Sequence, residues 1–244
     1  MKKIIISLSL LGALLGSNAA SAWDCCWASV GIKEWYQTYS PGGGLPAESQ
    51  AAQIISLTIG GERLFVNVAG SKEATYKNPA YPFGSVTYGP GSLNLGYMAT
   101  SEVAFTLGLK NPTSSYSIPS YFGSDDQPIT GWAQIPIIGM AYSHSFEDSP
   151  FSINGNFAYG RTNRTARPAI IGTTVVGTKS GEAAYLGYEL GASYALTQSF
   201  SFNLGYRVEQ FDDLVPVNVT ATVVTLSMEK IRVSGATVGL AYKF

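Results

Sequence analysis

Apolar and polar residues alternate with a period of two in several stretches of the chain. In the clearest stretch the even positions from Ala184 to Tyr194 are apolar, and the odd positions between them are mostly small, polar or charged. The same alternation returns in 103–109, 151–159 and 200–208. Successive side chains of a β-strand point to opposite faces of the sheet, so each stretch predicts a strand with one apolar and one polar face.

Turn residues divide the alternating pattern into ten predicted strands, with eight strands as the alternative count. The joins between strands are alternately short and long, which predicts an antiparallel up-and-down order. Two strands carry irregularities: Glu34 falls in the apolar phase of the first, and Pro136 lacks a backbone donor and predicts a bulge in the sixth. The ten predicted strands are Ala28–Tyr39, Ala51–Gly60, Arg63–Gly70, Ser92–Ala99, Glu102–Lys110, Gly131–Ser143, Phe151–Arg161, Glu182–Ala195, Phe200–Gln210 and Arg232–Phe244.

Two features favour a membrane barrel over a soluble sandwich. The polar faces hold many glycines and few Lys or Glu residues, which suits the crowded interior of a barrel. Backbone N–H and C=O groups find no water in lipid, so a sheet crosses a membrane only when it is closed. Aromatic residues also stand at the ends of the apolar faces, where rings favour a membrane–water boundary: Tyr97, Tyr142, Tyr159, Tyr194 and Tyr242. The pattern therefore predicts an all-β, transmembrane, antiparallel up-and-down barrel.

The N-terminal residues and the charge content narrow the class further. Lys2 and Lys3 precede an apolar run and the small residues Ala20-Ser21-Ala22, which predicts a secretory signal over residues 1–22 and a single barrel domain over 23–244. Only 13% of residues are charged, and 16 acidic residues stand against 15 basic ones, so no basic field for nucleic acid is expected. No later segment reaches the roughly 18 apolar residues of a helical span.

The end of the chain alternates as well. Val238, Leu240, Tyr242 and Phe244 are apolar, with Tyr third from last and Phe terminal. This ending resembles the C-terminal insertion signal of Gram-negative outer-membrane β-barrels, and the chain as a whole is similar to small barrels of the OmpA and OmpW size class. The resemblance implies an outer-membrane location, recognition by the barrel assembly machinery, and contact with outer-membrane lipids and lipopolysaccharide. We expect a monomer without a cofactor.

One hairpin allows its register to be predicted. If Leu196 and Phe200 face outward on either side of a three-residue turn, Glu189 lies directly opposite Arg207 inside the barrel, with Glu209 one diagonal step away. An isolated charge in a narrow interior is costly, whereas a hydrogen-bonded pair is tolerated. We therefore predict an ion pair that cross-links the wall from the inside, and the alternative role for it is a selectivity filter.

Candidate catalytic chemistry is sparse. Outer-membrane barrel enzymes (omptin-type proteases, lipid A palmitoyltransferases and deacylases, phospholipases) resemble this chain in architecture, and their families use a histidine near the outer rim or at the lipid-exposed wall. The single histidine, His144, is predicted at the opposite end, between Ser143 and Ser145, with Glu147 and Asp148 as the nearby carboxylates. Adjacent strand residues point to opposite faces, so we interpret His144 as a turn or interface residue and expect no enzyme.

The two cysteines leave alternatives open. Cys25 and Cys26 follow the predicted cleavage point directly and could form a vicinal disulfide, link to another chain, or be plain residues before the first strand. One histidine and two adjacent cysteines do not supply a tetrahedral metal site, so no metal is predicted.

The long joins and the interior suggest three functional classes. The leading hypothesis is a non-enzymatic barrel with a structural or surface-interaction role through its loops, of which 162–181 and 211–231 are β-branched enough to predict β-extensions. The second is a narrow channel for small polar or hydrophobic solutes, although barrels near eight strands are filled by their own side chains. The third, an envelope-lipid enzyme, is disfavoured by the missing outer-rim histidine.

Overall fold

In a computed structural model the described residues are 26–40, 47–77, 85–118, 127–131, 134–166, 170–171, 174–175, 179–219 and 224–244. Ten long strands build a barrel: β1 (Trp27–Ser40), β2 (Glu48–Gly60), β3 (Leu64–Ser71), β5 (Ser85–Met98), β6 (Val103–Ile118), β8 (Ile135–Ser145), β9 (Phe151–Ala166), β12 (Lys179–Ala195), β13 (Phe200–Val219) and β14 (Val224–Lys243). Four short strands accompany them: β4 (Ala74–Lys77), β7 (Gln127–Gly131), β10 (Ile170–Ile171) and β11 (Thr174–Val175).

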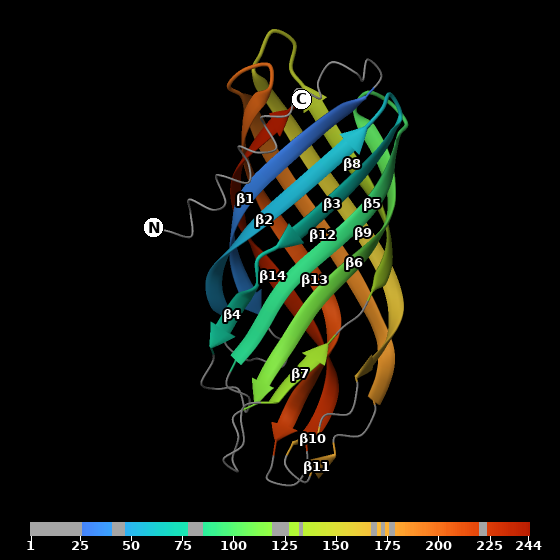
Figure 1. Ribbon diagram of the computed structural model, residues 1–244, viewed down its shortest axis with the longest axis vertical. Helices are drawn as coiled ribbons and strands as arrows, with labels where there is room; N and C mark the ends of the chain where they lie inside the picture. Colours follow the sequence, from blue (N-terminus) through green and yellow to red (C-terminus); the bar gives the residue numbers. More distant parts are fainter. Residues whose placement is uncertain are drawn as a thin grey trace.

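The sheet is closed. Each long strand pairs antiparallel with its neighbours in the chain, and β5 pairs with β6. The last strand, β14, pairs with β1 from Ser29 and Lys243 to Ser40 and Arg232, which closes the sheet (Figure 1). The wall therefore has no free edge, and the predicted all-β antiparallel barrel of ten strands is confirmed, whereas the alternative of eight is wrong. Among the described residues no helix is long and apolar enough to cross a membrane.

The strands tilt strongly against the barrel axis, as the diagonal arrows of Figure 1 show. From Ala28 on β1, successive pair partners lead through Ile59 and onward around the wall to Arg232, and they return to β1 at Ser40 instead of Ala28. A stagger of this kind is what closure of a tilted sheet requires. Gly235 fits this wall closely, because a Cβ there would lie 1.7 Å from the carbonyl oxygen of Tyr36 on β1.

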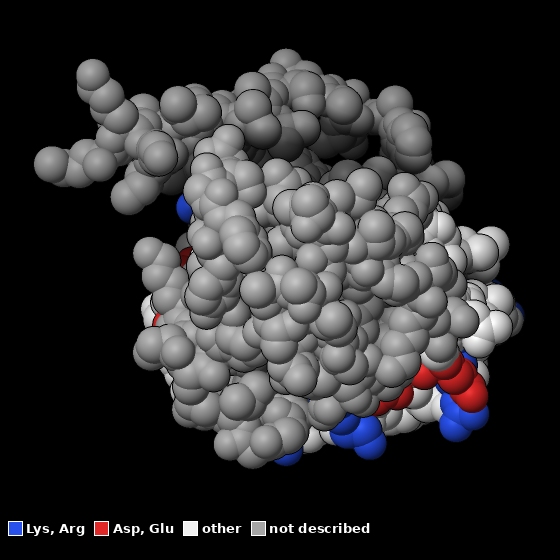
Figure 2. Space-filling view, turned by 90° about the horizontal axis from the view of Figure 1, so that it is seen from below, with Lys and Arg blue, Asp and Glu red and all other residues white. Residues whose placement is uncertain are grey.

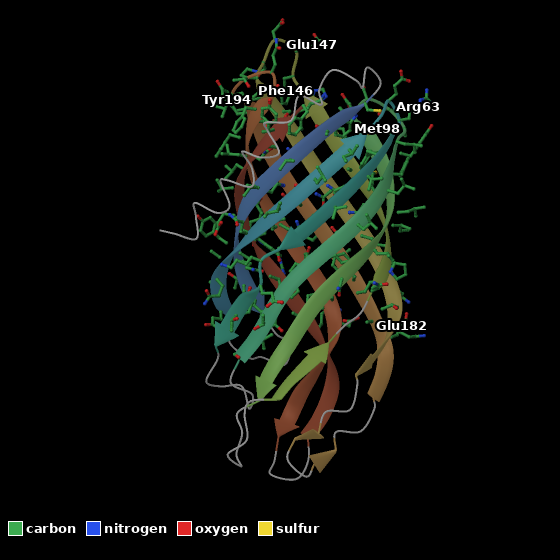
Figure 3. All side chains as sticks on the ribbon, in the orientation of Figure 1. Arg63, Met98, Phe146, Glu147, Glu182 and Tyr194 are labelled. Atoms are coloured by element: carbon green, nitrogen blue, oxygen red, sulfur yellow. The ribbon has the colours of Figure 1, made fainter. Side chains whose placement is uncertain are left out.

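The two ends of the barrel differ, as predicted. One end, here the short-turn end, carries the C-terminus and the tight connections (Figure 1). Figure 3 places Arg63, Met98, Phe146, Glu147 and Tyr194 there and Glu182 toward the other end, here the long-loop end. Asp148, in the turn before β9, has a φ of 53°, a left-handed conformation that Asp tolerates in tight turns. Figure 2 views the long-loop end, where described acidic and basic side chains lie side by side on part of the rim.

The outside of the wall is apolar. Leu190, Leu107 and Ile138 expose 68%, 63% and 60% of their surface, and similar side chains surround the barrel. Tyrosines border this apolar belt on both sides: Tyr97, Tyr142, Tyr194 and Tyr242 toward the short turns, and Tyr36, Tyr159, Tyr188 and Tyr206 toward the long loops. Soluble proteins rarely expose apolar patches of this extent.

Several strands extend further toward the long loops than the sequence pattern predicts. Residues 85–91 and 111–117, predicted as loop, continue the β5–β6 ladder through a pairing of Pro90 with Pro112. Neither proline has a backbone N–H to donate, but on its other side each faces a gap in the neighbouring wall. Pro90 lies at the gap between β3 and β4, and Pro112 lies at the gap between β8 and β7. The predicted extension of 211–231 is confirmed, since β13 and β14 pair as far as Val219 and Val224. In 162–181, β9 and β12 also extend beyond their predicted ends, and β10 and β11 form a small hairpin.

The predicted bulge at Pro136 is wrong. The pairing of β8 with β6 runs without a shift from Val103 and Tyr142 to Lys110 and Ile135. On the other side the β8–β9 ladder begins at Ile137, so the missing N–H of Pro136 deprives no partner of a bond.

Candidate functional site: the barrel lumen

Strand parity places five charged side chains inside the barrel, in a band we call the charge layer: Lys33, Lys110, Glu189, Arg207 and Glu209. Each shares its face with the small or polar positions of its strand, while the apolar belt lies on the opposite face. Because the strands are tilted, residues from β1, β6, β12 and β13 meet at one level of the lumen.

Glu209 is the centre of one half of the charge layer. Its carboxylate is 1% exposed and accepts hydrogen bonds from Lys110 Nζ at 2.6 Å and from Arg207 Nε at 3.1 Å. The Arg207 Nη2 and the Tyr88 hydroxyl also donate to it. A buried carboxylate needs such partners, because desolvation otherwise disfavours its charge.

Glu189 is the centre of the other half. The register pairs it with Arg207 across the β12–β13 hairpin, and Arg207 Nη1 lies 3.6 Å from Glu189 Oε2. Lys33 Nζ donates to Glu189 Oε1 at 2.6 Å, and the Thr237 hydroxyl does so at 3.4 Å. The structure thus brings together Glu189, Arg207 and Glu209, the three residues singled out in the sequence, and adds Lys33 and Lys110 to them.

Large side chains fill the lumen between the charge layer and the long-loop end. We call this set the aromatic plug: Trp35, Tyr39, Tyr76, Tyr88 and Phe211, which are all 2% exposed or less. Two pairs of rings stack, Tyr39 on Tyr76 with centroids 4.8 Å apart and Tyr88 on Phe211 at 5.4 Å. Ile135 and Ile231 complete the packing and are fully buried.

The aromatic plug and the charge layer are in contact. The Arg207 guanidinium lies over the Trp35 ring, 5.1 Å from its centroid, and Lys110 Nζ lies 5.5 Å from the centroid of Tyr185. At the long-loop end, burial raises the pKa of the Tyr76 phenol well above its usual range, and the nearby Glu48 carboxylate adds to this shift. Tyr76 therefore stays neutral, as its place in the plug requires.

On the short-turn side of the charge layer the lumen contains a cavity. This cavity of about 280 Å³ is bounded by Lys110, Tyr185 and Arg207, by polar residues such as Thr58, Asn67, Asn94, Thr106 and Asn156, and by apolar residues such as Phe65 and Ile137. Asn67 donates to the Thr58 hydroxyl at 2.9 Å, and nearer the short turns Asn154 donates to the Ser193 hydroxyl at 2.9 Å. Short polar side chains thus leave space that the aromatic plug does not.

His144 lies at the short-turn end, at the last residues of β8. Its Nδ1 is 2.7 Å from Glu102 Oε1, and its ring packs edge-on against Phe146 at 5.0 Å. The sequence pointed to Glu147 and Asp148 as the nearby carboxylates, whereas the partner is Glu102 from the preceding turn. Both members of the pair are more than a third exposed, and no described serine hydroxyl is bonded to the ring. The arrangement joins two turns.

The remaining predicted residues lie at the ends of the chain. Cys26 is half-buried just before β1, and Cys25 lies outside the described residues, so the vicinal disulfide stays a prediction. The predicted signal at 1–22 also lies outside them. Leu240 on β14 and Phe244 just after it are 45% and 46% exposed, and Tyr242 contacts the rings of Phe200 and Phe244. In the described part of the chain no group of His, Cys, Asp or Glu side chains is arranged to hold a metal ion.

Comparison with known proteins identifies no family. No protein-family model and no curated protein matches the chain. Among solved structures, the Neisserial surface protein A is 14% identical with a TM-score of 0.44, covering 89% of this chain and 97% of that one. The translocator domain of the autotransporter NalP from Neisseria meningitidis is 12% identical with a TM-score of 0.47, covering 100% and 98%. A Pseudomonas aeruginosa FadL homologue is 9% identical with a TM-score of 0.41, covering 91% and 90%. Similarity at this level carries no argument about function.

Proposed function

We propose that the chain is a non-enzymatic integral β-barrel of the Gram-negative outer membrane, which acts as a structural or surface-interaction protein through its long-loop end. The apolar belt and its tyrosine borders support the membrane location, because a closed sheet satisfies its backbone groups without water. The long-loop end then faces the outside, the short turns face the periplasm, and lipids and lipopolysaccharide contact the belt. The alternation of apolar residues over Val238, Leu240, Tyr242 and Phe244 supports recognition by the barrel assembly machinery.

The observation that carries this function is the filled outer half of the lumen. Trp35, Tyr39, Tyr76, Tyr88 and Phe211 are buried there, and the charged groups on the short-turn side of them are paired with one another. A wide pore needs hydrated space through the whole barrel, and ten strands enclose little more than side chains can fill. The barrel is therefore best suited to anchor its loops.

Planar-bilayer recording tests the closed lumen. We expect no current steps from the reconstituted protein, because the aromatic plug blocks the axis. The double variant Tyr88→Ala, Phe211→Ala removes one stacked pair and serves as the positive control, with an expected gain of small steps. A steady ohmic current through the unaltered protein would contradict the proposal.

One observation favours a second function, a narrow channel for small solutes. The cavity of about 280 Å³ already opens part of the lumen, so that displacement of the plug and of the charge layer beside it would complete a path. Voltage-dependent opening in the same recordings would favour this function. An enzyme of envelope lipids is a third class, and unchanged lipid A and phospholipid profiles on overexpression would discard it.

Fractionation and mass spectrometry test the location. We expect the chain in the outer-membrane fraction, as a monomer that begins at Trp23 after cleavage of the signal. Recovery from the soluble periplasm would contradict the membrane assignment.

A further inference from the structure

The charge layer holds more positive than negative groups. Lys33, Lys110 and Arg207 contribute three cations, while Glu189 and Glu209 contribute two carboxylates. Lys110 is 3% exposed and Arg207 is 20% exposed in its side chain, so water screens neither of them fully. A buried charge without a counter-charge is costly, and within the layer the cations outnumber the carboxylates by one. The inward carboxylate of Glu48 lies apart from the layer, beside Tyr76.

The two cations on the cavity side also keep unused hydrogen-bond donors. An ammonium group has three donors and a guanidinium five. Among the described residues Lys110 Nζ donates one hydrogen bond, to Glu209. Arg207 uses Nε and Nη2 on Glu209, but its Nη1 is 3.6 Å from Glu189 Oε2, which is too long for a normal hydrogen bond. The acceptors of the layer are thus used more fully than its donors.

These donors border the cavity. Lys110 and Arg207 both line the cavity of about 280 Å³, and so does Asn156, whose amide makes no side-chain hydrogen bond to the described residues. Water occupies about 30 Å³ per molecule in the liquid, so the cavity is large enough for a small ion together with several waters. Its walls present cationic and amide N–H groups, and the nearest carboxylates are already bonded to the cations.

We propose that this cavity binds a small inorganic anion, of halide size, as the counter-ion of Lys110 and Arg207. The anion accepts hydrogen bonds from the free ammonium and guanidinium N–H groups and from the Asn156 amide, and it balances the excess positive charge of the layer. The site goes beyond the proposed function, because a closed barrel that presents loops needs no bound ion.

Thermal unfolding of the refolded protein in a non-ionic detergent tests the site. Bromide replaces gluconate stepwise at constant ionic strength, and near-ultraviolet circular dichroism reports the midpoint. A ligand that binds the folded state alone raises the midpoint with its concentration, here by roughly 2–4 °C at saturation. The absence of a bromide-dependent shift in the unaltered protein would overturn the proposal.

Matched variants locate the effect. Asn156→Leu fills the cavity and should abolish the shift, whereas Asn154→Leu, on the same face of β9 but outside the cavity, should keep it. Lys110→Met should also abolish the shift, and if that variant does not fold, the asparagine pair decides. A shift that persists in Asn156→Leu, or one that disappears in both asparagine variants, would place any bound anion elsewhere and refute the site.

Discussion

The two halves of the lumen are built from the same alternation but are filled in opposite ways. Toward the long loops the inward positions carry the large side chains of Trp35, Tyr39, Tyr88 and Phe211, which are all 2% exposed or less. Toward the short turns they carry Asn, Ser and Thr, and a cavity remains. Parity decides which residues face inward, whereas side-chain size decides whether the interior is open. The closed half stabilises the barrel, and the hollow half leaves space for a ligand.

The largest loss of stability is expected in the charge layer, which lies between the two halves of the lumen. Glu209→Ala leaves Lys110 and Arg207 buried with one carboxylate fewer, so we expect a loss of about 3–5 kcal/mol in the free energy of unfolding. Denaturant titration of the reconstituted protein measures it. Glu182→Ala breaks an exposed ion pair with Arg161 and is the control, which should leave the transition almost unchanged. Equal losses in both variants would show that the buried charge layer stabilises the barrel no more than an exposed ion pair does.

Removal of one plug ring tests the closed half. Phe211 is 1% exposed and stacks on Tyr88, so Phe211→Ala should cost about 3 kcal/mol through lost burial and a new cavity. The same titration measures this loss. A change below about 1 kcal/mol would mean that the plug is loosely packed.

A double-mutant cycle tests the pair that the sequence predicted. Glu189→Gln and Arg207→Gln should be non-additive, with a coupling of about 1–2 kcal/mol. The control cycle combines Glu189→Gln with Glu182→Gln, which should be additive because the two positions share no partner. Additive losses in the first cycle would show that Glu189 and Arg207 do not stabilise each other.

The smallest effect is expected in the hollow half. Asn67→Ala removes the hydrogen bond that Asn67 donates to Thr58 and the long one that it accepts from Asn94. Water in the cavity can replace both, so the loss in the free energy of unfolding should stay below about 1 kcal/mol. A loss as large as that of Phe211→Ala would show that the two halves are equally packed, and the contrast between them would fail.

Much of the fold could be predicted from the alternation, because the face on which a strand residue lies depends only on its position along that strand. The β12–β13 register follows from one turn between Leu196 and Phe200, and it places Glu189 opposite Arg207. The strand ends toward the long loops were missed because Gly89, Pro90 and Pro112 read as loop, although the gaps beside both prolines remove the need for their donors.

The rest of the site depends on closure, which no single strand shows. Lys110 follows the outward Leu109 and was therefore predictable as an inward residue, but only the stagger of the barrel brings it to Glu209 on β13. Lys33 was obscured by Glu34, which faces outward and pairs with Gln53 and Val238. Glu102 meets His144 because two turns lie side by side at one end.

The central claim is that alternate residues of a closed sheet face lipid, and β13 tests it most directly. In a protein with Cys25 and Cys26 replaced by Ser, single cysteines at Ser201, Phe202, Asn203 and Leu204 are labelled with a fluorophore and reconstituted into brominated lipid. We predict strong quenching at positions 202 and 204 and little at 201 and 203. Equal quenching at all four positions, or none at any, would contradict a lipid-facing belt on a closed barrel.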